Sequence, residues 1–379
     1  MKRSPHFLSH AFRFLSAIVG FALSCTAVRA DWPMHRGNPQ LQGQTDAPAP
    51  AAVKLIWSFK APKPVKGAAA IAARRVFFGD DGGVIHALQL GDGKEIWTFK
   101  TEGPIEATPL VLGDTCYVGS SDAFLYALDV ATGALKWKYE TGDKILGGAN
   151  HAPGPEKTPE RILVGSYDNA LHCVDSVTGK LIWKAETDNY INGSPAITET
   201  GEVVFGGCDA VIHVVQLSDG AVLRKIDSDA YIASSVAVVG SRGYVGNYGN
   251  LVLGFDAAKG DILWRYRDRN FPYFSSAAVT KDRVVIGGRD KRLHCIDRES
   301  GAGIWVFQTR GQVDSSPVIC ADSVVVGSED GRLYCVTLAD GKERWTYDVA
   351  APVTASPAVS DGLIVVGAED GTVLALGAK

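Results

Sequence analysis

Histidines and aspartates carry the most evident chemistry in this sequence, because both residue types bind metal ions. The aspartates stand three residues after a glycine that ends an apolar run; they are Asp122, Asp168, Asp209, Asp290, Asp330 and Asp370. Calcium needs roughly six to eight oxygen atoms that converge on one point, whereas these residues occur once in each copy of a repeat. We therefore predict that each closes a turn by accepting backbone N–H bonds. The first copy shifts the acid to Asp81, and the fifth has Gly249 instead.

Four histidines occupy a single position of the same repeat; they are His86, His172, His213 and His294. Tyr126 and Tyr334 hold that position in other copies. Equivalent positions in separate copies cannot converge on one ion, so we predict that these rings stack between strands. The tryptophans described next share this once-per-copy pattern and are expected to pack neighbouring copies together.

Six cysteines follow the first 30 residues, and none forms a CxxC pair. Three of them fall at one position of the repeat. A disulfide requires Cα atoms within about 7 Å, so equivalent positions in different copies are too far apart to be bridged. We expect buried free thiols, since unpaired cysteine is among the most buried residue types.

The repeat itself is set by tryptophans that stand 40, 40, 46, 81, 41 and 40 residues apart. They are Trp57, Trp97, Trp137, Trp183, Trp264, Trp305 and Trp345. The step of 81 is two periods, with Arg224 at the missing position. A glycine precedes each of the later positions by four residues. A period near 40 residues is typical of propellers and solenoids.

Each copy reads as four short strands separated by turns, and no window shows a sustained helical period. Four antiparallel strands in about 40 residues make one blade of a β-propeller. The residues after Trp345 supply only three strands, and residues 53–59 provide the missing fourth. We therefore predict an all-β, eight-bladed propeller whose last blade is closed by the N-terminal strand. Seven blades is the alternative, if the copy around Arg224 were skipped.

Residues 1–30 have the features of a secretory signal peptide: an early basic region, an apolar run of about ten residues and a small-x-small ending at Ala30. We expect cleavage after Ala30 and a periplasmic or secreted chain; lipoprotein processing at Cys25 is the less favoured route. Residues 31–52 form a leader segment and residues 53–379 the propeller. Without residues 1–30 the net charge falls from −4 to −8, which argues against nucleic acid as a partner. No later segment is long and apolar enough to span a membrane, and we expect a monomer.

The repeat signature is Ala/Cys-x-Asp-x-x-x-Gly-x-x-x-Trp, as in Ala127–Trp137, Cys173–Trp183 and Cys295–Trp305. It resembles the tryptophan-docking repeat of the pyrroloquinoline quinone (PQQ)-like propellers. The resemblance implies two branches: dehydrogenases that bind PQQ and calcium, and non-catalytic scaffolds such as BamB. Alcohol-oxidising members usually carry adjacent cysteines and long insertions, and this chain has neither, nor a CxxCH haem motif. The non-catalytic, BamB-like branch is favoured, with no cofactor; PQQ and calcium belong to the alternative.

Candidate binding residues are positions where the chemistry of the repeat varies. Those at the expected channel mouth are Lys66, Glu106, Asn192, Phe274 and Asp314. An insertion of six residues in blade 3 offers a second candidate, a loop with His151, Glu156 and Lys157. Ordinary solvated loops are the favoured interpretation of both sets, and contact with a ligand or peptide is the alternative. The leading hypothesis is an exported, non-enzymatic scaffold that binds protein or peptide. The alternatives are a PQQ-binding oxidoreductase or quinone sensor, and a carbohydrate-binding propeller that uses Phe271, Tyr273 and Phe274.

Overall fold

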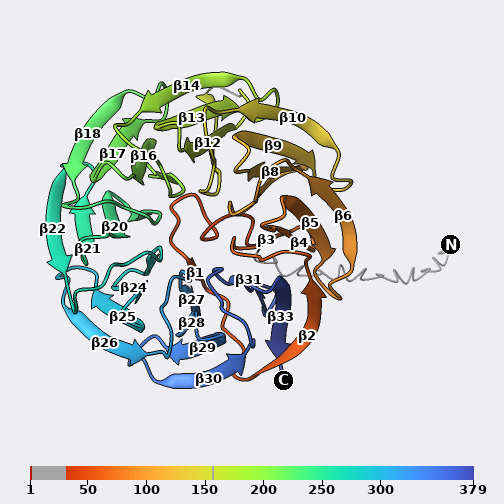
Figure 1. Cartoon of the computed structure of the whole chain (residues 1–379), viewed down its shortest axis with the longest axis vertical. Coiled ribbons are helices and arrows are strands. Elements are labelled where there is room, and N and C mark those ends of the chain that lie inside the picture. The colour runs from red at the N-terminus through yellow and green to blue at the C-terminus, as the bar shows by residue number, and fades with distance from the viewer. Residues whose placement is uncertain (2–30, 156–157) are drawn as a thin grey trace.

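A computed structural model describes residues 31–155 and 158–379 together with Met1. Eight sheets of four antiparallel strands stand around a central axis, and no α-helix occurs in the described residues (Figure 1). The predicted eight-bladed propeller is therefore confirmed, and the seven-bladed alternative is wrong. The blade that carries Arg224 is complete, since β18 (Val222–Asp227) pairs with its neighbour like the other outer strands.

Each blade runs from its innermost to its outermost strand in chain order. Blade 1 contains β3 (Ala70–Ala72), β4 (Arg75–Gly79), β5 (Val84–Gln89) and β6 (Glu95–Lys100). Blade 2 contains β7 (Leu110–Leu112), β8 (Thr115–Gly119), β9 (Phe124–Asp129) and β10 (Leu135–Glu140). Blade 3 contains β11 (Asn150–Ala152), β12 (Arg161–Ser166), β13 (Ala170–Asp175) and β14 (Leu181–Glu186). Blade 4 contains β15 (Ala196–Ile197), β16 (Glu202–Gly206), β17 (Val211–Gln216) and β18.

The second half of the ring repeats this order. Blade 5 contains β19 (Ala237–Val239), β20 (Arg242–Gly246), β21 (Val252–Asp256) and β22 (Asp261–Tyr266). Blade 6 contains β23 (Ala278–Val279), β24 (Arg283–Gly288), β25 (Arg292–Asp297) and β26 (Gly303–Gln308). Blade 7 contains β27 (Val318–Cys320), β28 (Ser323–Ser328), β29 (Arg332–Thr337) and β30 (Glu343–Asp348). Blade 8 contains β31 (Ala358–Ser360), β32 (Leu363–Gly367), β33 (Thr372–Ala378) and, from the start of the chain, β2 (Val53–Lys60).

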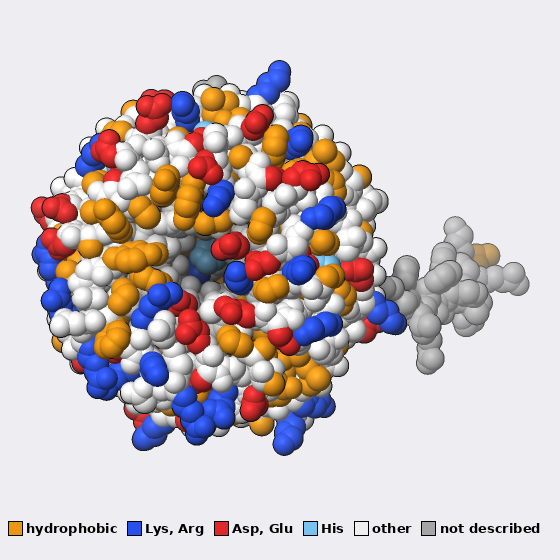
Figure 2. Space-filling view, viewed as in Figure 1, with side chains coloured by type: hydrophobic (Ala, Val, Ile, Leu, Met, Phe, Trp, Pro, Cys, Tyr) orange, Lys and Arg blue, Asp and Glu red, His pale blue; other side chains and the backbone are white. Residues whose placement is uncertain are grey.

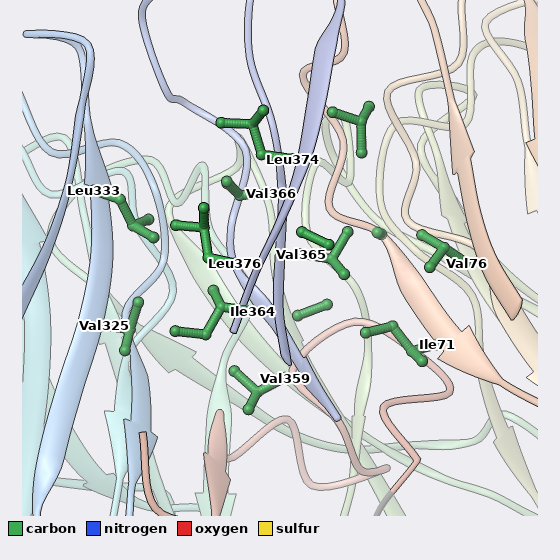
Figure 3. Close-up of a cluster of buried hydrophobic side chains, with 14 of the residues drawn as sticks. Ile71, Val76, Val325, Leu333, Val359, Ile364, Val365, Val366, Leu374 and Leu376 are labelled. Atoms are coloured by element: carbon green, nitrogen blue, oxygen red, sulfur yellow. The ribbon is translucent and has the colours of Figure 1, made fainter. Parts of the chain in front are cut away.

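The pairing of β2 with β33 closes the ring, with Trp57 opposite Ala375. Apolar side chains of blades 7, 8 and 1 meet behind this closure (Figure 3). Val365 and Leu376 of blade 8, for example, belong to one buried cluster with Val76 of blade 1. Burial of such a cluster is worth about 25 cal/mol per Å² of apolar surface. The first and last blades are therefore joined both by backbone hydrogen bonds and by a shared core.

The tryptophans dock each blade onto the next. The indole N–H of Trp97 donates to the carbonyl of Val130 at 3.0 Å, and the indole of Trp137 donates likewise to Ser176. Six of the seven rings also cover a turn glycine of the next blade, so that a Cβ added at Gly133 would lie 2.6 Å from Trp97. The indole of Trp345 donates to the carbonyl of Pro50 instead. Their predicted packing role matches these contacts.

The leader crosses the centre of the ring, which the sequence analysis did not anticipate. It forms backbone hydrogen bonds with the innermost strands of successive blades, from Trp32 with Ile71 in blade 1 to Thr45 with Ala321 beyond β27 of blade 7. Residues Gln44–Thr45 form β1, which adds a fifth, parallel strand to blade 7. Figure 1 shows this segment in red and orange, inside the ring. The leader is thus part of the folded propeller and not a free tail.

Five of the six aspartates close turns as predicted, and Asp290 instead contacts Nε2 of His294. The carboxylate of Asp122 accepts the backbone N–H of Phe124 at 3.1 Å, and that of Asp168 accepts the N–H of Ala170. The prediction for blade 1 was wrong: Asp80, not Asp81, accepts the N–H of Val84 there. Asp80 directly follows the glycine, and this geometry lets its carboxylate reach four residues ahead.

Histidines and tyrosines at their shared position contact these turn acids. Nε2 of His213 lies 2.7 Å from Asp209, and the hydroxyl of Tyr126 donates to Asp122 at 2.8 Å. The His213 ring also stacks on Phe205, with 5.1 Å between centroids. His172 and His294 also contact the hydroxyls of Tyr139 and Tyr266 on the outer strands of the preceding blades, so these histidines join blades as well.

The six cysteines of the described chain are free thiols, as predicted, and five of them are buried. Burial raises the pKa of Cys173 to about 12. Cys208 is the half-buried one, and burial raises its pKa as well. Within the described ranges no helix is long and apolar enough to cross a membrane.

Candidate binding face at the channel mouth

The chain path gives the propeller two different ends. Loops that lead from the outermost strand of one blade to the innermost strand of the next lie at the same end as the turns between second and third strands. We call this end the mouth face. The turns between first and second strands and between third and fourth strands lie at the opposite face. Loops held by a rigid scaffold are where binding residues concentrate.

A cavity of about 170 Å³ opens at the centre of the mouth face. Lys66, Glu106, Asn192 and Phe274 line it, so the structure brings four of the five predicted mouth residues together. Figure 2 shows this hollow, with a histidine side chain at its base. The fifth residue, Asp314, does not line the cavity because its carboxylate turns toward Arg289. Contact between these residues and a ligand stays a prediction.

Along the cavity wall, serine hydroxyls at the start of the innermost strands link neighbouring blades. The backbone N–H of Ser194 donates to the hydroxyl of Ser235 at 2.9 Å, and that of Ser235 donates to Ser276 at 3.0 Å. The series continues through Ser316 to Ser356. These bonds link blades 4 to 8 and fix the width of the channel. The hydroxyl of Ser234, a residue only 4% exposed, also lines the cavity and has no hydrogen-bond partner in the described chain.

The leader supplies the floor. His35 lines the cavity, and its Nδ1 lies 3.4 Å from the hydroxyl of Thr108. Burial, together with the charge of Arg36, lowers the pKa of His35 to about 3, so its imidazole is neutral near pH 7. The buried Arg36 donates to the carbonyls of Ala277 and Pro317, and burial lowers its pKa to about 9. The channel is therefore a cup, with the leader across one end.

Five aromatic side chains follow successive blades around one half of the mouth. We call this set the aromatic ridge; it consists of Tyr167, Tyr190, Tyr231, Tyr248 and Phe274. Tyr190, Tyr231 and Tyr248 are 44%, 53% and 47% exposed. Apolar side chains gather beside the hollow in Figure 2, over the blades coloured green and cyan in Figure 1. Large exposed apolar patches are typical of interaction sites.

Ring-to-ring contacts hold the ridge in place. Tyr167 and Tyr190 stack with centroids 4.6 Å apart, and Tyr248 lies 4.4 Å from Phe274. The guanidinium of Arg289 lies over the Phe274 ring, 3.9 Å from its centroid, while it binds Asp314 through two nitrogens. Side chains fixed in this way lose little conformational freedom when a ligand binds.

Carboxylates occupy the other half of the mouth. Glu106, Glu329 and Glu369 form what we call the acidic arc, and the described residues provide none of them with an ion-pair partner. Lys66 is engaged by Asp81 at 2.7 Å. That bond raises the pKa of Lys66, and the charges of Glu106 and Glu369 raise it further. Burial and the nearby Asp314 raise the pKa of Glu329. The charges of the acidic arc therefore act on one another and on Lys66.

The blade 3 loop lies at the opposite face, between β11 and β12. His151 belongs to β11, and its Nδ1 lies 3.2 Å from Glu160. Glu156 and Lys157 lie outside the described residues. The two candidate sites are therefore at different ends of the propeller and cannot form one surface.

The carbohydrate hypothesis grouped Phe271, Tyr273 and Phe274, but the structure places these side chains in different surroundings. Tyr273 is only 1% exposed and packs against His294, so it belongs to the core. Phe271 is 47% exposed, and Phe274 is half-buried within the ridge. The tyrosines of the ridge were missed because they occupy loops of different blades. Comparing copies two residues after the conserved glycine would have revealed Tyr167 and Tyr248.

One group of potential metal ligands already contacts an arginine side chain. Asp268, Asp290 and His294 bring their ligand atoms within 4.8 Å of one another. Arg292 donates to Asp268 at 2.7 Å and approaches Asp290 to 4.0 Å. The guanidinium therefore supplies the positive charge that this group needs.

Sequence comparison places the repeat in a known family. The family model described as outer membrane protein assembly factor BamB matches in overlapping segments that together cover residues 47–379. The chain belongs to this family. The PQQ-like repeat seen in the sequence is thereby confirmed. No curated protein sequence matches the chain.

Two solved structures show how widely the fold is shared. BamB from Moraxella catarrhalis superposes with a TM-score of 0.71 and 20% identity, over 86% of this chain and 98% of that one. The quinohemoprotein alcohol dehydrogenase from Comamonas testosteroni gives a TM-score of 0.78 and 14% identity, over 92% of this chain and 81% of that one. At these identities the likeness concerns the fold, which hosts both an assembly factor and a redox enzyme.

Proposed function

We propose that this BamB-family propeller is an exported, non-enzymatic and monomeric scaffold that binds a protein or peptide at its mouth face. The aromatic ridge carries this proposal. Tyrosine and arginine are enriched where protein interfaces concentrate their binding energy, and both occur here on loops fixed by the propeller. The family supports a periplasmic location, and the features of residues 1–30 support export with cleavage after Ala30.

The residues that line the cup also fit a scaffold better than an enzyme. Catalytic groups need a nucleophile, acid or base directed at a shared point. In the cup, His35 is held neutral and Lys66 is engaged by Asp81. Among the other lining residues, Ser194, Ser235 and Ser276 use backbone N–H groups and hydroxyls to bond one another between blades. These groups serve the wall rather than a reaction.

Peptide display gives a direct test of the proposal. A library of random peptides would be selected against immobilised protein that begins at residue 31, and selected clones would be measured against Tyr231→Ala/Tyr248→Ala. We expect the double variant to lose binding about tenfold or more, since each interface tyrosine contributes about 1–2 kcal/mol. The control is Val177→Ala, because Val177 is 67% exposed in the turn between β13 and β14 at the opposite face.

Two results would contradict the scaffold proposal. One is the absence of any peptide whose binding depends on the ridge. The other is stabilisation of the protein by PQQ with calcium, measured as a rise in melting temperature, since a ligand of the folded state must stabilise it. Saccharide binding that needs Tyr231 and Tyr248, with no peptide binding, would instead establish the carbohydrate function.

A further inference from the structure

The mouth face presents apolar and negative surfaces on opposite sides of one cup. The aromatic ridge spans blades 3 to 6, and the acidic arc belongs to blades 7, 8 and 2. Glu106 and Asn192 both line the cavity, and Oδ1 of Asn192 accepts a hydrogen bond from the hydroxyl of Tyr167. The two halves therefore border one cavity, and a single bound segment can contact both.

We propose that the mouth face recognises an extended, basic segment of a partner protein, with apolar side chains on the aromatic ridge and a lysine or arginine facing the acidic arc. This inference rests on the proposed protein-binding function and specifies the chemistry of the partner. The charge of the surface carries it. Lys66 and Arg289 are already engaged by Asp81 and Asp314, so Glu106, Glu329 and Glu369 remain as net negative charge at the cup.

The cup offers the basic side chain a hydrogen-bond acceptor as well as a field. The Ser234 hydroxyl is buried, lines the cavity and lacks a partner in the described chain. A buried polar atom without a partner costs about 1–3 kcal/mol. A donor that enters from the mouth relieves that cost. A lysine ammonium, which donates three hydrogen bonds and accepts none, suits an acceptor in a cavity that Glu106 also lines.

Geometry also favours a linear segment over a folded domain surface. The ridge curves around the mouth across four blades, and the cavity of about 170 Å³ admits one long side chain rather than a loop. Long charged side chains carry an apolar stem behind a charged head. The stem can pass Phe274 and Leu146, which line the cavity, while the head stays near the acidic arc.

Fluorescence polarisation with three synthetic probes tests this recognition. The first probe is a short labelled Gly-Ser peptide with a pair of lysines followed by a pair of phenylalanines. The second replaces the lysines by glutamates, and the third replaces the phenylalanines by serines. We expect the first probe to bind tightest. Glu106→Gln/Glu329→Gln/Glu369→Gln should weaken it by about tenfold, since exposed ion pairs contribute roughly 0.2–1 kcal/mol each, and should remove its salt dependence.

A matched control changes the same net charge at the opposite face. Glu199→Gln/Asp261→Asn/Glu343→Gln removes three exposed carboxylates there, and we expect the affinity for the first probe to stay within about twofold of wild type. Melting temperatures of both triple variants show whether each remains folded.

The outcomes separate this inference from the proposed function. If the acidic-arc variant binds the first probe as tightly as wild type while Tyr231→Ala/Tyr248→Ala still weakens it, the basic-segment inference is wrong and the scaffold function stands. If the glutamate probe binds as well as the lysine probe, the basic-segment inference is also wrong, because positive charge then contributes nothing to binding. If no probe responds to either variant, both ideas fail.

Discussion

Substituting the turn glycines tests how the blades dock, because the ring contains its own control. Gly133 lies in the turn before β10 with φ of +72°, and Gly260 lies in the equivalent turn before β22 with φ of +85°. A Cβ at Gly133 would lie 2.6 Å from Trp97, whereas at Gly260 the nearest atom within reach is Cδ of Arg224 at 3.8 Å. The two glycines share a left-handed backbone and differ in whether a tryptophan covers them.

The magnitudes follow from these two contributions. A left-handed backbone costs an L-residue roughly 1–2 kcal/mol, at both positions. Overpacking adds about 1–3 kcal/mol where a buried atom has no space, which applies to Gly133 alone. We therefore expect Gly133→Ala to lower the free energy of unfolding by about 2–5 kcal/mol and Gly260→Ala by only about 1–2 kcal/mol.

Urea unfolding followed by tryptophan fluorescence measures the difference. The transition midpoint of Gly133→Ala should fall clearly below that of Gly260→Ala, with similar slopes for both. Equal losses at the two positions would refute the reasoning, since they would show that backbone strain alone matters and that tryptophan docking does not.

Three further predictions concern the floor, the thiols and the ridge. Burial in the folded protein lowers the pKa of His35 to about 3. As pH falls below about 6.5, the unfolded chain therefore binds a proton at this site that the folded chain does not. Wild type loses up to about 1.4 kcal/mol of unfolding free energy per pH unit as a result. The stability of His35→Gln, followed by melting temperature from pH 7 to about pH 4, should fall less steeply, and parallel curves would contradict this. Under native conditions a maleimide should modify Cys208 first, with the other five thiols reacting only after unfolding; mass spectrometry checks this, and early modification of Cys173 would count against its burial. Arg289→Ala removes the contacts with Asp314 and Phe274 and should cost about 1 kcal/mol or less of stability. The same variant should lower the affinity of peptides selected on the ridge. Unchanged peptide affinity would show that Arg289 does not order the ridge.

The repeat made most of the fold predictable. Spacing between the tryptophans gave the blade count, and residues 53–59 were correctly expected to close the last blade against β33. These features are periodic and local, so one sequence displays them. Turn acids were also predictable in most blades. In blade 6 Asp290 contacts His294 instead. In blade 1 Asp80 and Asp81 are adjacent, and the sequence does not show which one reaches the N–H of Val84.

The leader and the ridge were not predictable by the same means. The leader has no strand period, and its hydrogen bonds join residues far apart in the chain, such as Pro39 with Ile197. His35 and Arg36 therefore gave no signal that they form the floor of the cup. Tyr190 and Tyr231 lie in loops, where each copy varies, and only the folded ring places Tyr190 on Tyr167 and Tyr231 beside Tyr248.

Site-specific photocrosslinking tests most directly whether the mouth face binds a protein. A photoreactive phenylalanine derivative would replace Tyr231 in one strain and Val177, at the opposite face, in another, and the adducts formed in living cells would be resolved by size and mass spectrometry. The account predicts a discrete polypeptide adduct at Tyr231 and none at Val177. Adducts absent at Tyr231, or equal at both positions, would contradict a protein-binding mouth face.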